Sequence, residues 1–144
     1  MKAFLDTSSL IKLYHQEEGS EQLQDLLSID VERIYLSDLA KLEFRSAFWR
    51  KVRMNELTEE VISEVISLFE KDQEQYGWIK ISHEILKKSS DLIMKYGKEG
   101  LRTLDSLQLS CAITLRADDC GFFTSDELLK SFFEKEQLNV IHYE

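Results

Sequence analysis

The chain has 144 residues, 43% of them hydrophobic and 31% charged, and its formal net charge at pH 7 is -9. This length predicts one domain over residues 1–144 with a substantial core, and the composition excludes an intrinsically disordered chain. The acidic balance disfavours a protein that binds nucleic acid with its whole surface, but it leaves room for a local basic cluster or a bound metal cation.

The first half of the chain alternates short apolar runs with helical periodicities. An opening strand over 2–6 ends at an acid, Asp6. The expected elements after it are a short helix from about Ser9, a helix over 20–28, a strand over 33–36, a helix from Ser37 or Asp38 to about 53, and a helix capped by Thr58.

The second half continues the alternation. Its expected elements are a strand over 77–81, a helix from Ser82 to about 96, a turn between Gly97 and Gly100, a helix capped by Thr103 and running to about 117, a strand over 121–124, a helix over 126–133 and a last strand over 139–142. Strands and helices in alternation favour a three-layer α/β/α fold with a mostly parallel central sheet. Ligands bind at the carboxyl ends of the strands in such sheets.

Four acids stand out because they lie at strand ends or among apolar helix positions. Asp6 and Asp126 follow expected strands, and Asp105 lies in the first turn of its helix. A helical wheel places Glu43 inside a broad apolar arc made by Leu39, Ala40, Leu42, Phe44, Ala47 and Trp49. It places Asp105 near the edge of an apolar face made by Leu104, Leu107, Leu109, Cys111, Ala112 and Leu115.

Each acid also has an ordinary structural explanation. Glu43 could form a salt bridge, Asp105 could complement the helix dipole, Asp126 could be an N-cap, and Asp6 could form a turn into the next helix. If a parallel sheet brings all four to one edge, however, their mutual repulsion requires a cation. Oxygen ligands alone favour Mg²⁺ or Mn²⁺ over zinc, and the chemistry suited to such a site is phosphodiester hydrolysis by an activated water.

Three segments carry a resemblance to a known family. AFLDTSSLIKLY, LAKLEFRSAFWRK and LRTLDSLQLSCAITLRADDCGFFTSDELL resemble the PIN-domain ribonucleases, especially VapC-type toxins of toxin–antitoxin pairs. The resemblance covers nearly the whole chain. It implies that Asp6, Glu43 and Asp105 are the core ligands of Mg²⁺ or Mn²⁺, and that Asp126 is the fourth acid.

The resemblance also implies supporting residues and partners. Ser8 is expected to hydrogen-bond Asp6 or a metal-bound water, and Thr124 and Ser125 are expected to do similar work. The family implies a parallel sheet covered on both faces, a homodimer, an RNA substrate, and an antitoxin whose C-terminal segment can place an Arg near the acids.

Basic residues concentrate around the segment that carries Glu43. The candidate RNA contacts are Lys12, Lys41, Arg45, Arg50, Lys51 and Arg102, with Arg53 nearby. They are expected to meet phosphates. An equally good explanation for those on the Glu43 helix is a solvated face whose cations complement the helix dipole.

Two other functions remain open at this stage. A PIN-like domain could bind RNA or a protein partner without cutting, although four retained acids argue against that. A phosphatase with Asp6 as nucleophile, like the haloacid dehalogenases, needs a second Asp at position 8, where this chain has Ser8. No GxxxxGK[ST] motif is present, which disfavours a P-loop NTPase.

The expected location is the cytoplasm, with no membrane partner. No apolar run reaches the length of a membrane span, and the start MKAFLD meets an acid too early for a signal peptide. Cys111 and Cys120 form no CxxC pair or zinc-finger spacing and are expected to be thiols in a reducing compartment.

Overall fold

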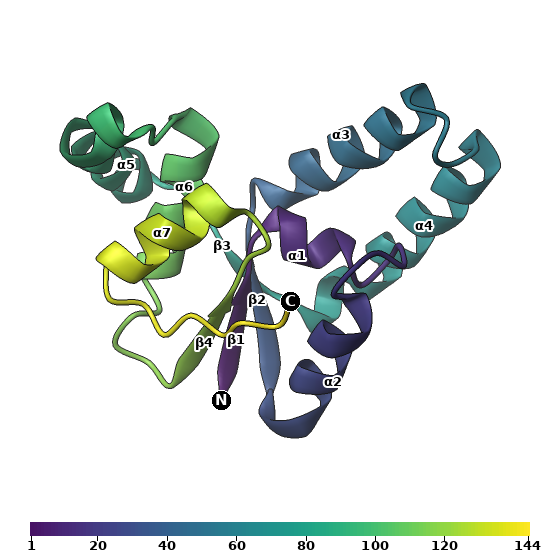
Figure 1. Ribbon diagram of the computed structural model, residues 1–144, viewed down its shortest axis with the longest axis horizontal. Coiled ribbons are helices and arrows are strands. Elements are labelled where there is room, and N and C mark those ends of the chain that lie inside the picture. The colour runs from purple at the N-terminus through teal and green to yellow at the C-terminus, as the bar shows by residue number, and fades with distance from the viewer.

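Four short apolar runs form one parallel sheet in the computed structural model, which describes residues 1–144 (Figure 1). The strands are β1 (Lys2–Leu5), β2 (Arg33–Ser37), β3 (Gly77–Ile79) and β4 (Cys120–Phe123). Their order is β3-β2-β1-β4, and every neighbouring pair is parallel. All four carboxyl ends therefore lie at the same edge of the sheet.

The side chains of β1 alternate between two hydrophobic cores. Phe4 packs into a core shared with helices α5 (His83–Tyr96), α6 (Thr103–Ile113) and α7 (Glu127–Lys135). Ala3 and Leu5 point to the other face, where the core is shared with helices α1 (Thr7–Ile11), α2 (Ser20–Asp30), α3 (Ala40–Arg53) and α4 (Glu59–Asp72). Burial on both faces confirms the expected three-layer α/β/α fold.

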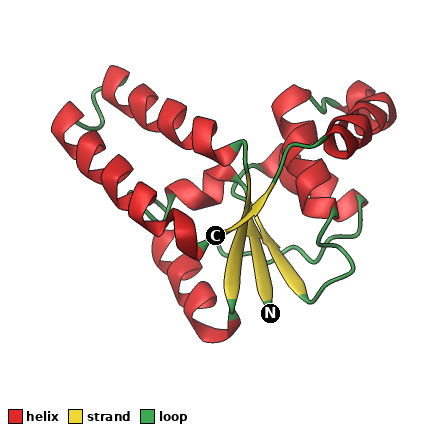
Figure 2. Cartoon of the chain, turned by 180° about the vertical axis from the view of Figure 1, so that it is seen from behind, coloured by secondary structure: helices red, strands yellow, loops and turns green.

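The helices stand in two groups above the carboxyl edge of the sheet (Figures 1 and 2). The long helices α3 and α4 form a hairpin on one side, and α5, α6 and α7 gather on the other (Figures 1 and 2). Helix α1 lies between them at the end of β1 (Figure 1). Two short 3₁₀ turns, η1 (Gln73–Gln75) and η2 (Gly97–Glu99), follow α4 and α5. No helix combines the length and the hydrophobicity needed to cross a membrane.

Side-chain caps set the starts of several helices. The hydroxyls of Thr58 and Ser82 accept hydrogen bonds from backbone N–H groups in the first turns of α4 and α5, as expected. The Asp6 carboxylate caps α1 in the same way, so that helix begins at Thr7 rather than at Ser9. Thr103 is the first residue of α6 and not its cap.

The end of α6 and the last expected strand differ most from the sequence expectation, and β3 ends at Ile79 rather than at residue 81. Helix α6 ends at Ile113, because the next N–H groups bond carbonyls three residues back and tighten the chain into the turn before β4. The expected last strand over 139–142 is wrong, since it is reduced to a single parallel bridge between Phe122 and Val140. The tail then leaves the sheet, and the Tyr143 hydroxyl bonds the Ser9 hydroxyl at 2.7 Å.

Some helix positions expected to be buried are exposed. Leu42 is 70% exposed, Trp49 43% and Leu104 50%. In α3 the fully buried side chains are Ala40, Phe44 and Phe48 instead. The apolar arc predicted around Glu43 is thus only partly a core face, because the side of α3 that carries Leu42 and Trp49 faces solvent.

Candidate active site

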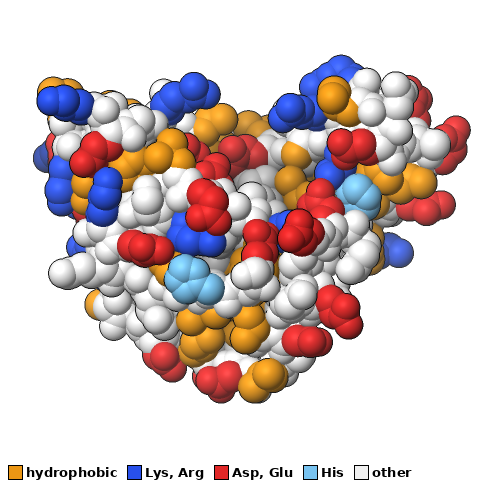
Figure 3. Space-filling view, in the orientation of Figure 1, with side chains coloured by type: hydrophobic (Ala, Val, Ile, Leu, Met, Phe, Trp, Pro, Cys, Tyr) orange, Lys and Arg blue, Asp and Glu red, His pale blue; other side chains and the backbone are white.

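Three of the four predicted acids line one cleft at the carboxyl edge of the sheet. Glu43 lies in the first turn of α3, Asp105 lies in the first turn of α6, and Asp126 caps α7. Together with Arg102 they line a cleft of about 750 Å³. Figure 3 shows acidic side chains low in the hollow between the two groups of helices, with Lys and Arg side chains higher on both sides.

The fourth acid, Asp6, follows β1 directly and is only 4% exposed. Its Oδ1 accepts hydrogen bonds from the Ser8 hydroxyl at 2.8 Å and from the Ser9 N–H at 3.0 Å. Its Oδ2 accepts one from the Thr124 hydroxyl at 2.7 Å. Thr124 follows β4, so the neighbouring strand ends of the parallel sheet bring these two residues together.

The surroundings of two of the acids, Asp6 and Asp105, raise their pKa values. Burial raises the pKa of Asp6 to about 6; the hydrogen bonds from Thr124, Ser8 and Ser9 counteract this, and the charge of Asp126 adds to it. Burial also raises the pKa of Asp105, as do the charges of Asp126 and Glu43, while Arg102 lowers it. The four carboxylates therefore act on one another electrostatically even where they do not touch.

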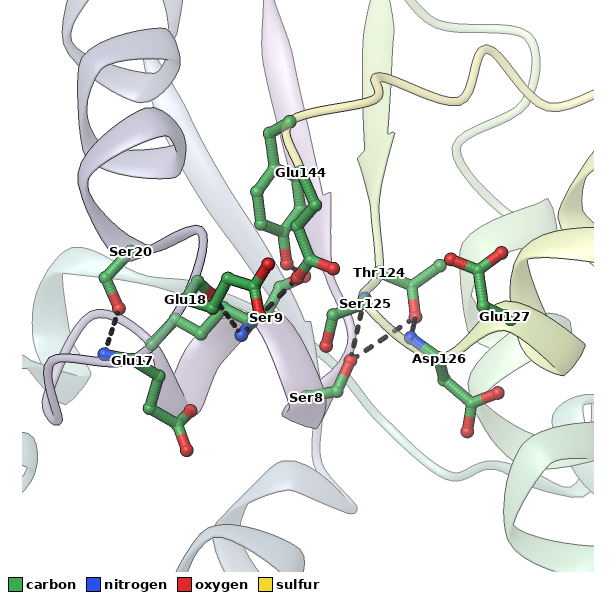
Figure 4. A network of polar contacts seen from close by, with 12 residues as sticks. Ser8, Ser9, Glu17, Glu18, Ser20, Thr124, Ser125, Asp126, Glu127 and Glu144 are labelled. Atoms are coloured by element: carbon green, nitrogen blue, oxygen red, sulfur yellow. Dashed lines mark hydrogen bonds and ion pairs between the residues drawn. The ribbon is translucent and has the colours of Figure 1, made fainter.

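The supporting hydroxyls lie largely where they were expected. Ser8 and Thr124 both donate to Asp6. Ser8 in turn accepts a hydrogen bond from the Ser125 N–H at 3.0 Å, and Thr124 accepts one from the Asp126 N–H at 3.0 Å (Figure 4). Ser125 thus contributes through its backbone, and the network links the end of β1 to the start of α7.

Two residues that the sequence analysis did not single out hold Glu43. The Thr7 hydroxyl donates to Glu43 Oε1 at 2.7 Å, and Gln108 Nε2 donates to the same oxygen at 2.8 Å. Both could have been found by position. Thr7 follows Asp6 directly, and Gln108 lies three residues after Asp105, on the same side of α6.

None of the four acids forms an ion pair with a Lys or Arg side chain. Such a set of oxygen donors fits a hard divalent cation in its chemistry. As the side chains stand, no group of three or more His, Cys, Asp or Glu residues could hold a metal ion. Direct coordination of one cation by three or more of these acids therefore requires their side chains to move closer together.

Three of the predicted RNA contacts line clefts at this edge. Arg102 lines the acidic cleft itself. Arg50 and Lys51 line a second cleft of about 400 Å³, which also contains Ser8 and Ser125. Lys51 is paired there with Glu17 at 2.7 Å, whereas Arg50 is exposed and forms no ion pair. Arg50 and Arg102 are thus the predicted contacts most available to a phosphate.

The other three predicted contacts are engaged by neighbouring groups. Lys12 is buried and donates to a backbone carbonyl in the loop after α1. The acidic partners of Lys12, Lys41 and Arg45 are Glu144 at 3.4 Å, Asp38 at 3.2 Å and Glu70 at 3.1 Å, respectively. These three side chains would have to exchange partners in order to bind RNA.

Comparison with known proteins identifies the family. The sequence model of the PIN-domain family matches residues 3–132 of this chain. A search of curated proteins gave no match.

Solved structures of similar fold include VapBC2 from Rickettsia felis, bound to a DNA fragment from its promoter. It has 15% identity and a TM-score of 0.65 over 100% of both chains. A toxin–antitoxin complex from Klebsiella pneumoniae has 18% identity and a TM-score of 0.61, with 99% of this chain and 98% of that chain covered. The sarcin–ricin loop cleaving toxin VapC20 from Mycobacterium tuberculosis has 9% identity and a TM-score of 0.69, over 91% of this chain and 95% of that one. At these identities the likeness establishes the fold.

Proposed function

Because the chain belongs to the PIN-domain family, we propose that it is a metal-dependent endoribonuclease and the toxin of a toxin–antitoxin pair. The observation that carries this proposal is the set of acids at the carboxyl edge of the sheet, which come from four separate segments and have no cationic partner. Asp6 is buried, and Glu43 and Asp105 are partly buried. Carboxylates without a cationic partner in such surroundings cost stability, and a divalent cation removes that cost.

The four acids share one part in the proposed site, and the residues beside them have supporting parts. Asp6, Glu43, Asp105 and Asp126 would hold Mg²⁺ or Mn²⁺. When bound, the cation supplies an activated water for attack on phosphorus and stabilises the leaving oxygen. Ser8 and Thr124 fix the orientation of the Asp6 carboxylate, and Arg102 at the cleft can bind a phosphate oxygen of the substrate.

RNA is the substrate that the comparisons favour. One structure of similar fold is described as a sarcin–ricin loop cleaving toxin. The basic side chains above the acidic floor of the hollow suit a phosphate backbone (Figure 3).

An antitoxin is the partner that the comparisons favour, since two of the similar structures contain antitoxins. The homodimer and the cytoplasmic location stay predictions from the sequence.

The phosphatase alternative loses support from the placement of Ser8. That residue occupies the position where a haloacid-dehalogenase-like enzyme needs its second Asp, and its hydroxyl donates to Asp6. The binding-only alternative is favoured by one observation, because the acids do not form a ready metal cluster as they stand.

The experiment that separates cutting from binding uses Asp105→Asn. We expect cleavage of single-stranded RNA in Mg²⁺ or Mn²⁺, none in EDTA, and a loss of at least about 100-fold in the variant, in line with losing a group that holds the catalytic metal. Asp91→Asn, at an exposed acid on α5, is the matched control and should cut like the wild type. Wild-type protein that binds RNA but takes up no Mn²⁺ by calorimetry would establish the binding-only function instead.

A further inference from the structure

The Glu43 carboxylate and two polar side chains beside it, those of Thr7 and Gln108, form a closed ring of hydrogen bonds. Thr7 Oγ1 donates to Glu43 Oε1 at 2.7 Å, Gln108 Nε2 donates to the same oxygen at 2.8 Å, and Gln108 Nε2 also donates to Thr7 Oγ1 at 3.1 Å. Thr7 and Gln108 donate all three of these hydrogen bonds, and Oε1 of Glu43 accepts two of them.

The ring determines which oxygen of Glu43 remains available. Oε1 accepts two hydrogen bonds from Thr7 and Gln108, and Oε2 accepts none. Glu43 also lines the acidic cleft. The ring therefore restrains the carboxylate through one oxygen and leaves the other for a ligand.

The ring also joins the two halves of the molecule at the carboxyl edge of the sheet. Glu43 and Thr7 belong to α3 and α1, which pack on one face. Gln108 belongs to α6, which packs on the other. The Gln108 side chain thus crosses the edge of the sheet and connects α3, which carries Glu43, to α6, which carries Asp105.

A purely structural role explains Gln108 poorly. Its side chain is 3% exposed, and its carbonyl oxygen is buried without any donor. A buried, unpaired amide oxygen costs roughly 1–3 kcal/mol. An apolar residue of similar size would avoid that cost, so the stability of the fold alone does not account for a glutamine here.

We propose that Gln108, with Thr7, is a positioning residue that restrains the Glu43 carboxylate through Oε1 and leaves Oε2 free for the divalent cation. This inference rests on the proposed function. Gln108 touches neither substrate nor metal in this account, and it acts only through Glu43.

The test compares Gln108→Met and Thr7→Val, which keep shape and remove the donors, with Ser110→Ala as matched control. Ser110 is a buried polar residue of the same helix whose hydroxyl bonds the Ile85 carbonyl at 3.2 Å, away from the acids. Calorimetric Mn²⁺ titration of metal-free protein is the main readout, and unfolding temperature in EDTA checks the fold. Two variants with separate contacts to Glu43 guard against one of them failing to fold.

We expect each donor variant to raise the Mn²⁺ dissociation constant about 10-fold or more, the usual size of effect for a group that orients a metal ligand. RNA cleavage should fall at low Mn²⁺ and recover largely at high Mn²⁺. The double variant should weaken Mn²⁺ binding by less than the product of the two single effects, because both act on one oxygen. The Ser110 variant should bind Mn²⁺ like the wild type.

Two results distinguish the failure of this inference from the failure of the proposed function. If the wild type binds Mn²⁺ and cuts RNA while both donor variants bind Mn²⁺ equally well, the positioning role is wrong and the nuclease stands. If the wild type neither binds Mn²⁺ nor cuts RNA, the proposed function is wrong, and the role of Gln108 falls with it.

Discussion

At the scale of single residues, Asp6 combines features that a purely structural acid would not need. It is nearly buried, it caps α1, and three donors converge on it. Burial nevertheless outweighs those donors and raises its pKa to about 6. A cap alone would be served by a neutral Ser or Asn at lower cost, so the carboxylate is best explained by a cation.

The first prediction concerns stability in the absence of metal. Because the folded-state pKa of Asp6 is raised, the folded protein binds its proton more tightly than the unfolded chain, and stability falls as pH rises from about 4 through about 6. At pH 7 the ionised carboxylate costs on the order of 3 kcal/mol. Asp6→Asn should therefore raise the unfolding temperature by several degrees in EDTA at pH 7, and a scanning calorimeter should find that gain shrinking towards pH 4.

The second prediction concerns metal binding as a function of pH. A cation needs the ionised form of Asp6, so Mn²⁺ affinity measured by calorimetry should drop as pH falls from 7 to 5. The drop should approach 10-fold per pH unit below the pKa of about 6. An affinity that stays constant over this range would remove Asp6 from the site.

At the scale of elements, the sequence predicted most strands and helices because their apolar periodicity is local. The run AFL before Asp6 and the run GFF before Thr124 are strands to within a residue or two. The single bridge at Val140 depends on how the C-terminal segment packs against β4, and the early end of α6 depends on the turn that leads into β4. Both are set by contacts with the sheet and not by the local sequence, so the sequence did not predict them.

The placement of the acids was predictable for the same reason that the fold was. Parallel strands put their carboxyl ends at one edge, so Asp6 and Asp126 had to approach each other. The contacts of Gln108 with Thr7 and Glu43 join three helices. A wheel drawn for one helix shows which side Gln108 takes but gives no sign of its partners.

The third prediction separates two roles of Asp126 in α7. Its Oδ1 accepts a hydrogen bond from the Leu129 N–H at 2.9 Å and caps the helix. Asp126→Asn keeps an acceptor and should change the free energy of unfolding little, whereas Asp126→Ala should lose about 1 kcal/mol. Both should weaken Mn²⁺ binding to a similar extent. If the Asn variant bound Mn²⁺ as the wild type does, Asp126 would be a cap and nothing more.

At the scale of the whole molecule, the distribution of charge matters more than its sum. The net charge of -9 repels RNA at long range, yet basic side chains stand above the acids in the hollow (Figure 3). The composition alone indicates that the acidic net charge disfavours RNA binding. The structure adds which basic side chains are available: Arg50 and Arg102 have no ion pair, whereas Lys12, Lys41 and Arg45 are each paired with an acid.

The fourth prediction follows from that distribution. RNA binding by the inactive Asp105→Asn protein, measured by fluorescence anisotropy, should weaken as salt increases. Adding Arg50→Gln should reduce the slope of log affinity against log salt by about 0.7, the contribution of one phosphate contact on a single strand. Lys12→Gln, at a buried lysine already paired with Glu144, should leave the slope unchanged. If Lys12→Gln reduced the slope and Arg50→Gln did not, RNA binding would depend on a paired lysine that exchanges its acidic partner for a phosphate, and not on the unpaired arginine side chain.

The central claim is that side chains from distant parts of the chain share one divalent cation, and anomalous diffraction from crystals grown with Mn²⁺ tests it most directly. We expect a manganese peak at the carboxyl edge of the sheet, in contact with carboxylate oxygens of Asp6, Glu43 and Asp105, with their side chains drawn together relative to the present structure. Crystals that hold manganese elsewhere on the molecule, with these three acids still apart, would contradict it.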